Sequence, residues 1–247
     1  MRKILIRRYS IKKNDLFVND GKQEGKFKGV VYSCVNHSYD ALHNPLFYCD
    51  EIDYKLFIDD TIKVSNSFWN VEQIEIEEKF INYANRFYKM HPFELFDKYD
   101  YAVYVDGNVQ VISDLSPLYY VARKSKTGLA FHLHSMRDCA YDEAQVCKIL
   151  KKGNKNAINN QMMEYKKNGF PKNYGLLECP IIVVDLQNEN GKIILDAWWD
   201  EFVKWGSMRD QLSLPYVLWK KGYSINDVGL LGTNAKENYK FRFYSHI

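Results

Sequence analysis

The sequence predicts an α/β fold: one domain built on a mainly parallel central sheet with helices on its faces. Two observations carry this prediction. Continuous apolar and β-branched runs, typical of buried strands, occur at residues 29–35, 101–105 and 180–185. Stretches with apolar residues at helical spacing lie between them, and strands that alternate with helices favour parallel pairing through right-handed crossovers.

The composition is that of a globular protein with a large core. Of the 247 residues, 46% are apolar and 26% charged, so the fold needs neither disulfides nor a structural metal. A formal net charge of +3 is too small to indicate nucleic-acid binding. No repeat or long linker divides the chain. We therefore expect an N-terminal strand or arm over residues 1–28 and a single domain over 29–247.

Cysteine usage and hydropathy indicate a cytoplasmic setting. The chain has five cysteines and no C-x-x-C pair, which favours a reduced compartment over a disulfide framework or a zinc site. No run of 18 apolar residues exists, and the charged N-terminus is not typical of a signal peptide.

The sequence predicts strands and one long helix in the first half of the chain. After the arm come a buried strand, a polar loop over 36–44 and a second strand ending at Asp59-Asp60. Apolar residues at helical spacing then predict a helix that His91-Pro92 ends. A third strand runs into Asp106-Gly107-Asn108, and extended structure resumes after it. The expected ranges are 29–35, 54–58, 101–105 and 109–112 for strands and 77–90 for the helix.

The sequence predicts four helices and two further strands in the second half of the chain. Gly128 begins one strand and Pro180 the other, each followed by β-branched or aromatic residues. Helical spacing recurs four times, and a polar tail follows the last helix. The expected strands are 128–134 and 180–185, and the expected helices are 141–151, 157–167, 193–205 and 211–220.

Polar residues follow three of the strands, where a parallel sheet binds its ligands. The strongest of these segments is Asp106-Gly107-Asn108, whose first and last side chains point the same way if the segment is extended. Two oxygens so placed suit a hard cation such as Mg²⁺ or Mn²⁺, and Gly107 lets a diphosphate approach the backbone. The alternative is a β-hairpin turn, which Asp-Gly between apolar runs also signals and which spacing alone favours. No Rossmann or P-loop motif is present.

Two other groups of residues carry charge at suggestive spacing. Arg86 and Lys89 lie three residues apart on the predicted helix 77–90 and can hold a diphosphate, although a solvated helix face explains them as well. Asp210 opens the predicted helix 211–220, where the helix dipole favours its ionised form and where a capping role is the common explanation.

A cluster of His132, His134, Arg137 and Glu143 follows the strand 128–134. The two histidines share one face of a strand, but without a third ligand a metal site is weakly supported, and structural histidines are favoured. A lysine-rich stretch further on suits anionic lipid or an acidic polysaccharide, against the simpler explanation of a solvated surface. Its members are Lys148, Lys151, Lys152, Lys155, Lys166, Lys167 and Lys172.

Several segments together resemble a family of GT-A-like proteins first catalogued as a domain of unknown function. It includes plant mucilage-related proteins and bacterial capsule or lipopolysaccharide glycosyltransferases. The matching segments run from about residue 29 to the C-terminus. They are Val30–Cys34, Asn85–His91, Tyr104–Asn108, His134–Ala144 and Arg209–Tyr216.

The resemblance implies a GT-A fold and a set of site residues. Asp106 and Asn108 would stand at the Asp-x-Asp metal motif, with Asn replacing the second Asp and weakening the affinity for Mn²⁺ or Mg²⁺, and His246 would be the further metal ligand. The donor nucleotide would be held by Ser33, Asp59, Asp60, Arg86, Lys89 and Asp106. His132, His134 and Arg137 would line the acceptor side, with Asp210 as first choice and Glu143 as second for the catalytic base.

The resemblance therefore implies a metal-assisted glycosyltransferase. It would move a sugar from a nucleotide-sugar donor to a glycan or lipid-linked glycan acceptor in capsule- or lipopolysaccharide-type biosynthesis. Peripheral contact with the inner membrane face is an expectation from the basic segments and not from the resemblance, and a solvated surface is the favoured explanation of those segments. Two alternatives stay open: a nucleotidyltransferase or hydrolase with a similar cradle, and an inactive carbohydrate-binding module, which Asn108 and the 15% of aromatic residues favour.

Overall fold

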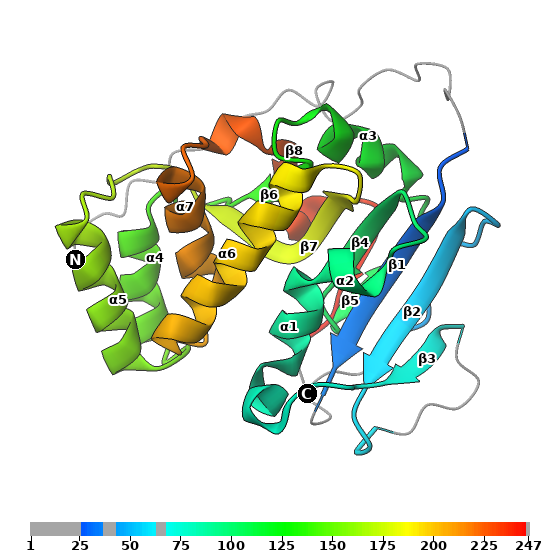
Figure 1. Cartoon of the computed structure of the whole chain (residues 1–247), viewed down its shortest axis with the longest axis horizontal. Coiled ribbons are helices and arrows are strands. Elements are labelled where there is room, and N and C mark those ends of the chain that lie inside the picture. The colour runs from blue at the N-terminus through cyan, green and yellow to red at the C-terminus, as the bar shows by residue number, and fades with distance from the viewer. Residues whose placement is uncertain (1–25, 37–42, 63–67, 246–247) are drawn as a thin grey trace.

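A seven-stranded sheet forms the centre of the protein in the computed structural model, which describes residues 26–36, 43–62 and 68–245. The strands lie in the order β3-β2-β1-β4-β7-β6-β8 (Figure 1). Their bounds are Asn70–Gln73 for β3, Ile52–Ile58 for β2, Gly29–Val35 for β1, Tyr101–Val105 for β4, Leu177–Asp185 for β7, Leu129–Leu133 for β6 and Gly229–Thr233 for β8.

Most strand pairs are parallel, as the sequence predicts, but β7 is antiparallel to both of its neighbours, β4 and β6. The two helices that separate β6 from β7 explain this reversal. They are α4 (Ala140–Ile149) and α5 (Lys155–Lys167), which pack together as a helical hairpin. Because a hairpin returns the chain to the edge that it left, β7 starts beside the end of β6, with Leu177 opposite Leu133.

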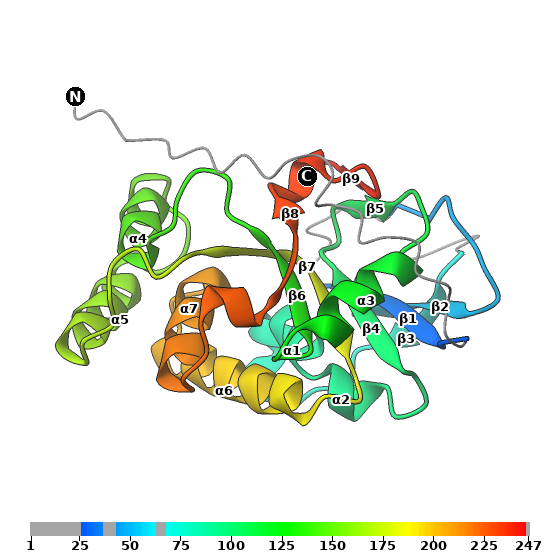
Figure 2. The ribbon, with the colours of Figure 1, turned by 90° about the horizontal axis from the view of Figure 1, so that it is seen from above.

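The faces of the sheet carry two separate cores. On one face lie α1 (Ala84–Met90), α2 (Pro92–Leu95) and α6 (Glu189–Trp205); on the other lie α3 (Ser116–Lys124) and a small sheet of β5 (Val109–Val111) with β9 (Phe241–Phe243) (Figure 2). Strand alternation divides the side chains: Tyr32 and Tyr104 belong to the first core, Val31 and Val103 to the second. A third cluster joins α4 and α5 to α7 (Asp210–Lys220).

Most of the expected elements are confirmed, with differences at short segments. The expected helix 77–90 begins as a 3₁₀ helix, Glu78–Tyr83, before α1. No sequence pattern predicted α2, α3, β3, β8 or β9. The hairpin alternative for Asp106-Gly107-Asn108 is wrong, because β5 pairs with β9 and not with β4. The segment is nevertheless a tight turn, since the Val109 amide donates to the Asp106 carbonyl at 2.9 Å. The expectation of an extended segment, in which the Asp106 and Asn108 side chains point the same way, is therefore wrong.

Candidate active site

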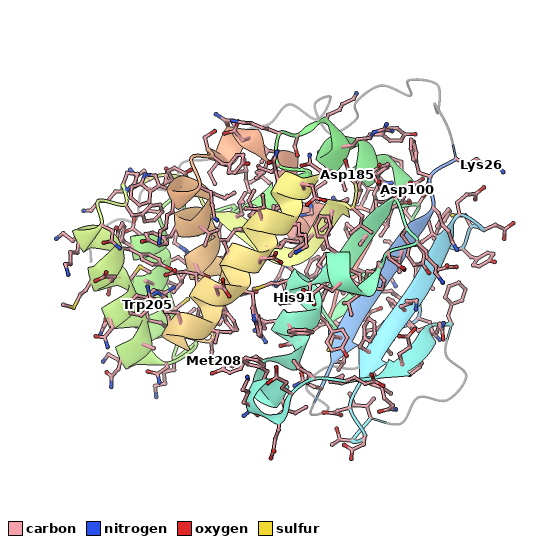
Figure 3. All side chains as sticks on the ribbon, viewed as in Figure 1. Lys26, His91, Asp100, Asp185, Trp205 and Met208 are labelled. Atoms are coloured by element: carbon pink, nitrogen blue, oxygen red, sulfur yellow. The ribbon has the colours of Figure 1, made fainter. Side chains whose placement is uncertain are left out.

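The site residues gather at the carboxyl ends of β1, β2 and β4. Figure 3 places Met208, two residues before α7, on the side toward which the arrowheads of β1 and β2 point. The start of α7 therefore lies at the edge of the sheet where ligands of parallel strands bind. Asp106 follows β4 at the same edge.

A buried ion-pair cluster, here called the Lys89 cluster, joins Lys89, Asp106 and Asp210. The Lys89 ammonium lies 2.6 Å from Asp210 Oδ2 and 3.8 Å from Asp106 Oδ1. Its side chain is only 4% exposed and lies over the rings of Tyr104 and Trp198. The alternative of a solvated helix face is therefore wrong for Lys89.

Charge pairing keeps both ends of this cluster ionised. Burial alone would lower the pKa of the Lys89 ammonium, but Asp210 and Asp106 outweigh it and the pKa is raised. Burial alone would raise the pKa of the Asp210 carboxyl, but the charges of Lys89, Arg86 and Arg209 hold that pKa well below its usual range. The second oxygen of Asp210 accepts a hydrogen bond from the Gln211 amide at 2.9 Å. Asp210 is thus a first-turn acid of α7, as the sequence indicates, and not its N-cap.

Arg86 extends the cluster toward β1. Its Nη1 donates to Asn85 Oδ1 at 2.8 Å, and its side chain is partly exposed. Burial raises the pKa of the Cys34 thiol near the end of β1, Asp59 raises it further and Arg86 opposes both. Arg86 therefore lies within electrostatic reach of Cys34 and Asp210, which places it between the end of β1 and the start of α7.

The turn after β4 offers oxygens suited to a hard cation. The Asp106 side chain is 38% exposed. The amide nitrogen of Asn108 donates to the Tyr244 carbonyl at 2.9 Å, so its Oδ1 is the oxygen turned away from that contact. Tyr244 also stacks on His43, with ring centroids 3.5 Å apart. One carboxylate and one amide oxygen fit Mg²⁺ or Mn²⁺, which leave further positions to phosphate and water. His246 lies outside the described residues.

A second cluster, here called the Arg137 cluster, joins His134, Arg137 and Glu143 at the start of α4. Arg137 Nε donates to Glu143 Oε2, and His134 Nε2 lies 3.7 Å from the same oxygen. The backbone amides of Met136 and Arg137 donate to His134 Nδ1 at 3.1 Å each. Burial, aided by Arg137, lowers the pKa of His134 to about 4, so its ring is neutral at pH 7.

Arg209 connects the two clusters, and the sequence analysis gave it no role. Burial would lower the pKa of its guanidinium, but Cys147, Asp210 and Glu143 raise it, so Arg209 lies within reach of both carboxylates. Its place directly before Asp210 was the available signal. Glu178 on β7 was also missed. It accepts hydrogen bonds from the amides of Ser135 and Ala235, at 3.4 and 2.7 Å, and so holds the loop that carries the Arg137 cluster.

The structure does not bring two of the expected residues into these clusters. Ser33 is 1% exposed and points to the opposite face of the sheet from Tyr32, and its hydroxyl has no hydrogen-bond partner within the described part of the chain. His132 is fully buried, and its Nε2 lies 3.0 Å from Nδ2 of Asn238. Burial lowers the pKa of His132 to about 4. His134 lies beyond the end of β6, beside Arg137 and Glu143, so the two histidines do not contact the same groups. Asp60 is exposed just after β2.

A separate group of potential metal ligands lies on the helical face. Atoms of His91, Glu94 and Asp196 are within 4.8 Å of one another. The His91 ring, labelled in Figure 3, bonds through Nδ1 to the Phe87 carbonyl at 2.8 Å. Lys192 pairs with Asp196 at 2.8 Å and so occupies one carboxylate. This group belongs to α1, α2 and α6, away from the strand ends.

Solved structures similar to this chain include several glycosyltransferases, at low sequence identity. The galactosyltransferase LgtC is 13% identical, with 75% of this chain and 69% of that chain covered and a TM-score of 0.43. Mouse xyloside xylosyltransferase 1 is 5% identical, with 80% and 83% covered and a TM-score of 0.46. The bifunctional glycosyltransferase WbbM is 14% identical, with 77% and 37% covered and a TM-score of 0.47. No curated protein sequence matches the chain.

A family model gives the assignment. The model of the TOD1/MUCI70 glycosyltransferase-like domain matches residues 10–230, which is most of the chain. This match confirms the expected activity class, glycosyl transfer, and it agrees with the α/β sheet of the GT-A type. The chain therefore belongs to the TOD1/MUCI70 family of glycosyltransferase-like domains.

Proposed function

We propose that the protein transfers a sugar from a nucleotide-sugar donor to a glycan or lipid-linked glycan, with help from Mn²⁺ or Mg²⁺, in the synthesis of a capsule- or lipopolysaccharide-type polysaccharide in the cytoplasm. One observation carries the proposal. Lys89 joins Asp106, on the donor side, to Asp210, on the acceptor side, in one buried cluster. Donor phosphates and an acceptor hydroxyl would therefore meet beside the same charges.

Asp106 and Asn108 would hold the metal. The exposure of the Asp106 carboxylate supports this assignment, and Asn108 binds the Tyr244 carbonyl through its amide nitrogen, which leaves its Oδ1 outside that contact. When bound, the cation would neutralise the negative charge that the leaving diphosphate acquires. The Asn108 amide is also committed to the Tyr244 carbonyl, which supports a structural role for this residue beside any contact with a metal.

Arg86 is our candidate for direct contact with the diphosphate, because its guanidinium is partly exposed and carries a planar set of donors. The Lys89 ammonium is already paired with Asp210 and Asp106, so we do not assign it to the diphosphate. We assign it instead to positioning Asp210. A carboxylate whose pKa is held this low is a weak base near neutral pH. We therefore assign Asp210 to orienting the acceptor and to stabilising positive charge at the sugar carbon.

The Arg137 cluster would shape the acceptor side. Arg137 and Glu143 belong to the loop and helix that follow β6, and Arg209 links them to Asp210. A saccharide hydroxyl approaching Asp210 would meet guanidinium donors and carboxylate acceptors, the groups that bind sugar hydroxyls through hydrogen bonds.

Calorimetry with nucleoside diphosphates tests the proposal, with and without Mn²⁺. We expect metal-dependent binding that Asp106→Ala abolishes and Asn108→Asp strengthens, because the latter adds a negative charge at the metal. Asp59→Ala, also at a strand end, is the comparison: as an expected nucleotide contact it should weaken binding but leave the dependence on the metal in place. Unchanged metal-dependent affinity in Asp106→Ala would remove the turn from the donor site.

Analysis of the products separates the proposal from its alternatives. A transferred sugar supports it. Release of nucleotide products without a new glycan would instead indicate a nucleotidyltransferase or hydrolase. Binding without any turnover would indicate an inactive carbohydrate-binding module, for which the commitment of Asn108 to Tyr244 is the structural argument.

A further inference from the structure

Two large aliphatic side chains stand exposed at the turn between α4 and α5. Ile149, the last residue of α4, is 77% exposed, and its neighbour Leu150 is 56% exposed. The buried face of α4 consists of Ala140, Glu143, Ala144 and Cys147. Ile149 and Leu150 lie off that face, so the packing of the helical hairpin does not require them.

Lysines surround this pair. Lys148 precedes it, Lys151 and Lys152 follow it, and Lys155 begins α5. We call residues 148–155 the α4–α5 tip. Between residues 140 and 172 the sequence has seven lysines and three acidic residues, so this segment alone exceeds the net charge of +3 of the whole chain. One of the three, Glu143, is buried against Arg137.

The tip lies directly against the segment that leads into the candidate active site. The Asn154 amide donates to the Ser207 carbonyl at 3.1 Å, three residues before Asp210. Gly153 has φ +82°, and a Cβ there would come within 2.3 Å of the Ser207 carbonyl oxygen. Only glycine allows this close approach. Whatever binds the tip is therefore held beside the mouth of the site.

We infer that the α4–α5 tip docks on an anionic lipid bilayer, with Ile149 and Leu150 inserted among the headgroups and the flanking lysines on the lipid phosphates. Adjacent aliphatic side chains within a lysine ring suit such an interface, since apolar burial and attraction to anionic lipid add. An acidic polysaccharide would use the lysines but gain little from exposed isoleucine and leucine. No helix among the described residues is long and apolar enough to span a bilayer, so contact through a surface is the mode that these residues support.

The biological purpose of this docking rests on the proposed function. A lipid-linked acceptor lies in the membrane plane, and docking through the tip would hold the start of α7 close to that plane. The docking itself, however, is a property of the surface and needs neither donor nor metal. It can therefore be measured separately from sugar transfer.

Co-sedimentation with vesicles tests the docking. Full-length protein is mixed with phosphatidylcholine vesicles that either contain or lack phosphatidylglycerol, at low and high salt. We expect binding to the anionic vesicles only, weakened by salt. Lys151→Gln/Lys152→Gln should lower it about 25-fold, at about fivefold for each lysine. Ile149→Ser/Leu150→Ser should lower it about tenfold or more.

Matched controls come from the same hairpin. Met163 is 71% exposed on α5, and Lys166 and Lys167 lie at the far end of that helix, more than a Debye length (about 10 Å) from the tip. Met163→Ser and Lys166→Gln/Lys167→Gln should change binding less than about twofold. All of these side chains except Lys148 are exposed and free of the core, so the variants should fold, and circular dichroism checks this.

Three results would overturn the inference. The first is no binding of the wild-type protein to anionic vesicles. The second is equal loss in the tip and control lysine variants with no effect of the aliphatic pair, which indicates diffuse attraction. The third is binding to dextran sulfate that needs Lys151 and Lys152, with no binding to vesicles, which indicates an acidic polymer. Sugar transfer to a soluble acceptor should be unchanged in the tip variants; its absence from the wild-type protein would contradict the proposed function and leave the vesicle result standing.

Discussion

The two ion-paired clusters of the candidate site differ in how the chain assembles them. In the Lys89 cluster, Lys89 and Asp210 lie 121 residues apart and belong to α1 and α7. In the Arg137 cluster, His134, Arg137 and Glu143 lie within ten residues of one another. Both are largely buried: the Lys89 and Asp210 side chains are 4% and 8% exposed, and those of Arg137 and Glu143 are 15% and 6%.

The difference separates two tasks. The Arg137 cluster organises one loop and the first turn of one helix, so it can form locally. The Lys89 cluster exists only when α1, the end of β4 and α7 have docked together, so it depends on the tertiary fold. The long-range cluster should therefore be the more damaging one to break.

The largest effect is expected for Asp210→Asn. It leaves the Lys89 ammonium buried without its partner, which costs about 3–5 kcal/mol of the free energy of unfolding. Sugar transfer should be lost as well. Urea unfolding monitored by circular dichroism gives the first quantity and a transfer assay the second.

The double variant Lys89→Met/Asp210→Leu is the control for this experiment. It removes both charges and should recover most of the stability while remaining inactive, because buried pairs are often replaced by apolar residues without loss. If Asp210→Asn unfolds at the wild-type urea concentration and transfers sugar normally, the Lys89 cluster has neither role.

Acid should affect the two clusters in separate pH ranges. His134 has a pKa lowered to about 4 by burial and Arg137, against roughly 6.5 in the unfolded chain. Between these values the unfolded state binds the proton and the native state does not, so stability falls as the pH falls from about 6.5 to 4, by up to roughly 3 kcal/mol. Asp210 has a depressed pKa, so its contribution persists at all pH values above about 3.9 and is lost only below that.

Urea unfolding at several pH values checks this separation. Part of the loss of stability between pH 6.5 and 4 should disappear in His134→Gln. The glutamine side chain keeps an acceptor for the two backbone amides. His132, whose pKa is also lowered to about 4 by burial, should account for a similar part. An unaltered pH profile in His134→Gln would show that its native pKa is not depressed.

The smallest effect is expected for Glu143→Gln. Arg137 loses its charged acceptor, but its side chain is 15% exposed and can turn toward water. We expect the free energy of unfolding to fall by about 1–3 kcal/mol, as for loss of a hydrogen bond to a charged group. The exposed neighbour Asp142 provides the control, since Asp142→Asn should stay within about 0.5 kcal/mol of wild type. If Glu143→Gln lowers the free energy of unfolding more than Asp210→Asn does, the Arg137 cluster is the more damaging one to break.

The fold was predictable where local pattern decides it. Buried strands such as β1 and β4 have continuous apolar runs, and α5 and α7 have helical periodicity. The missed strands owe their existence to distant partners. β3 is a short, largely polar edge strand, and β9 has three residues that pair with β5. The reversal of β7 follows from the packing of α4 on α5, which no strand pattern records.

In the site, the sequence identified the charged residues but not their burial. Spacing placed Arg86 and Lys89 side by side on a helix. It could not show that Lys89 turns into the core, because the carboxylate that makes this possible lies 121 residues away. For the same reason Arg209 was missed, since its electrostatic interactions with Asp210 and Glu143 depend on the docking of α7 against α4.

The small sheet of β5 and β9 holds the end of the turn that carries Asp106 and Asn108. Three register pairs connect its strands, and the Tyr244 amide adds one bond to the Asn108 carbonyl at 2.9 Å. Its hydrogen bonds are few, but Val109, Val111 and Phe241 are buried in the same core as Val103 of β4. Opening this sheet would therefore expose apolar surface as well as break hydrogen bonds. Backbone amides of β5 and β9 should then exchange with solvent deuterium together, and later than those of exposed loops. The turn is thus anchored at both ends, by β4 before Asp106 and by the small sheet after Asn108.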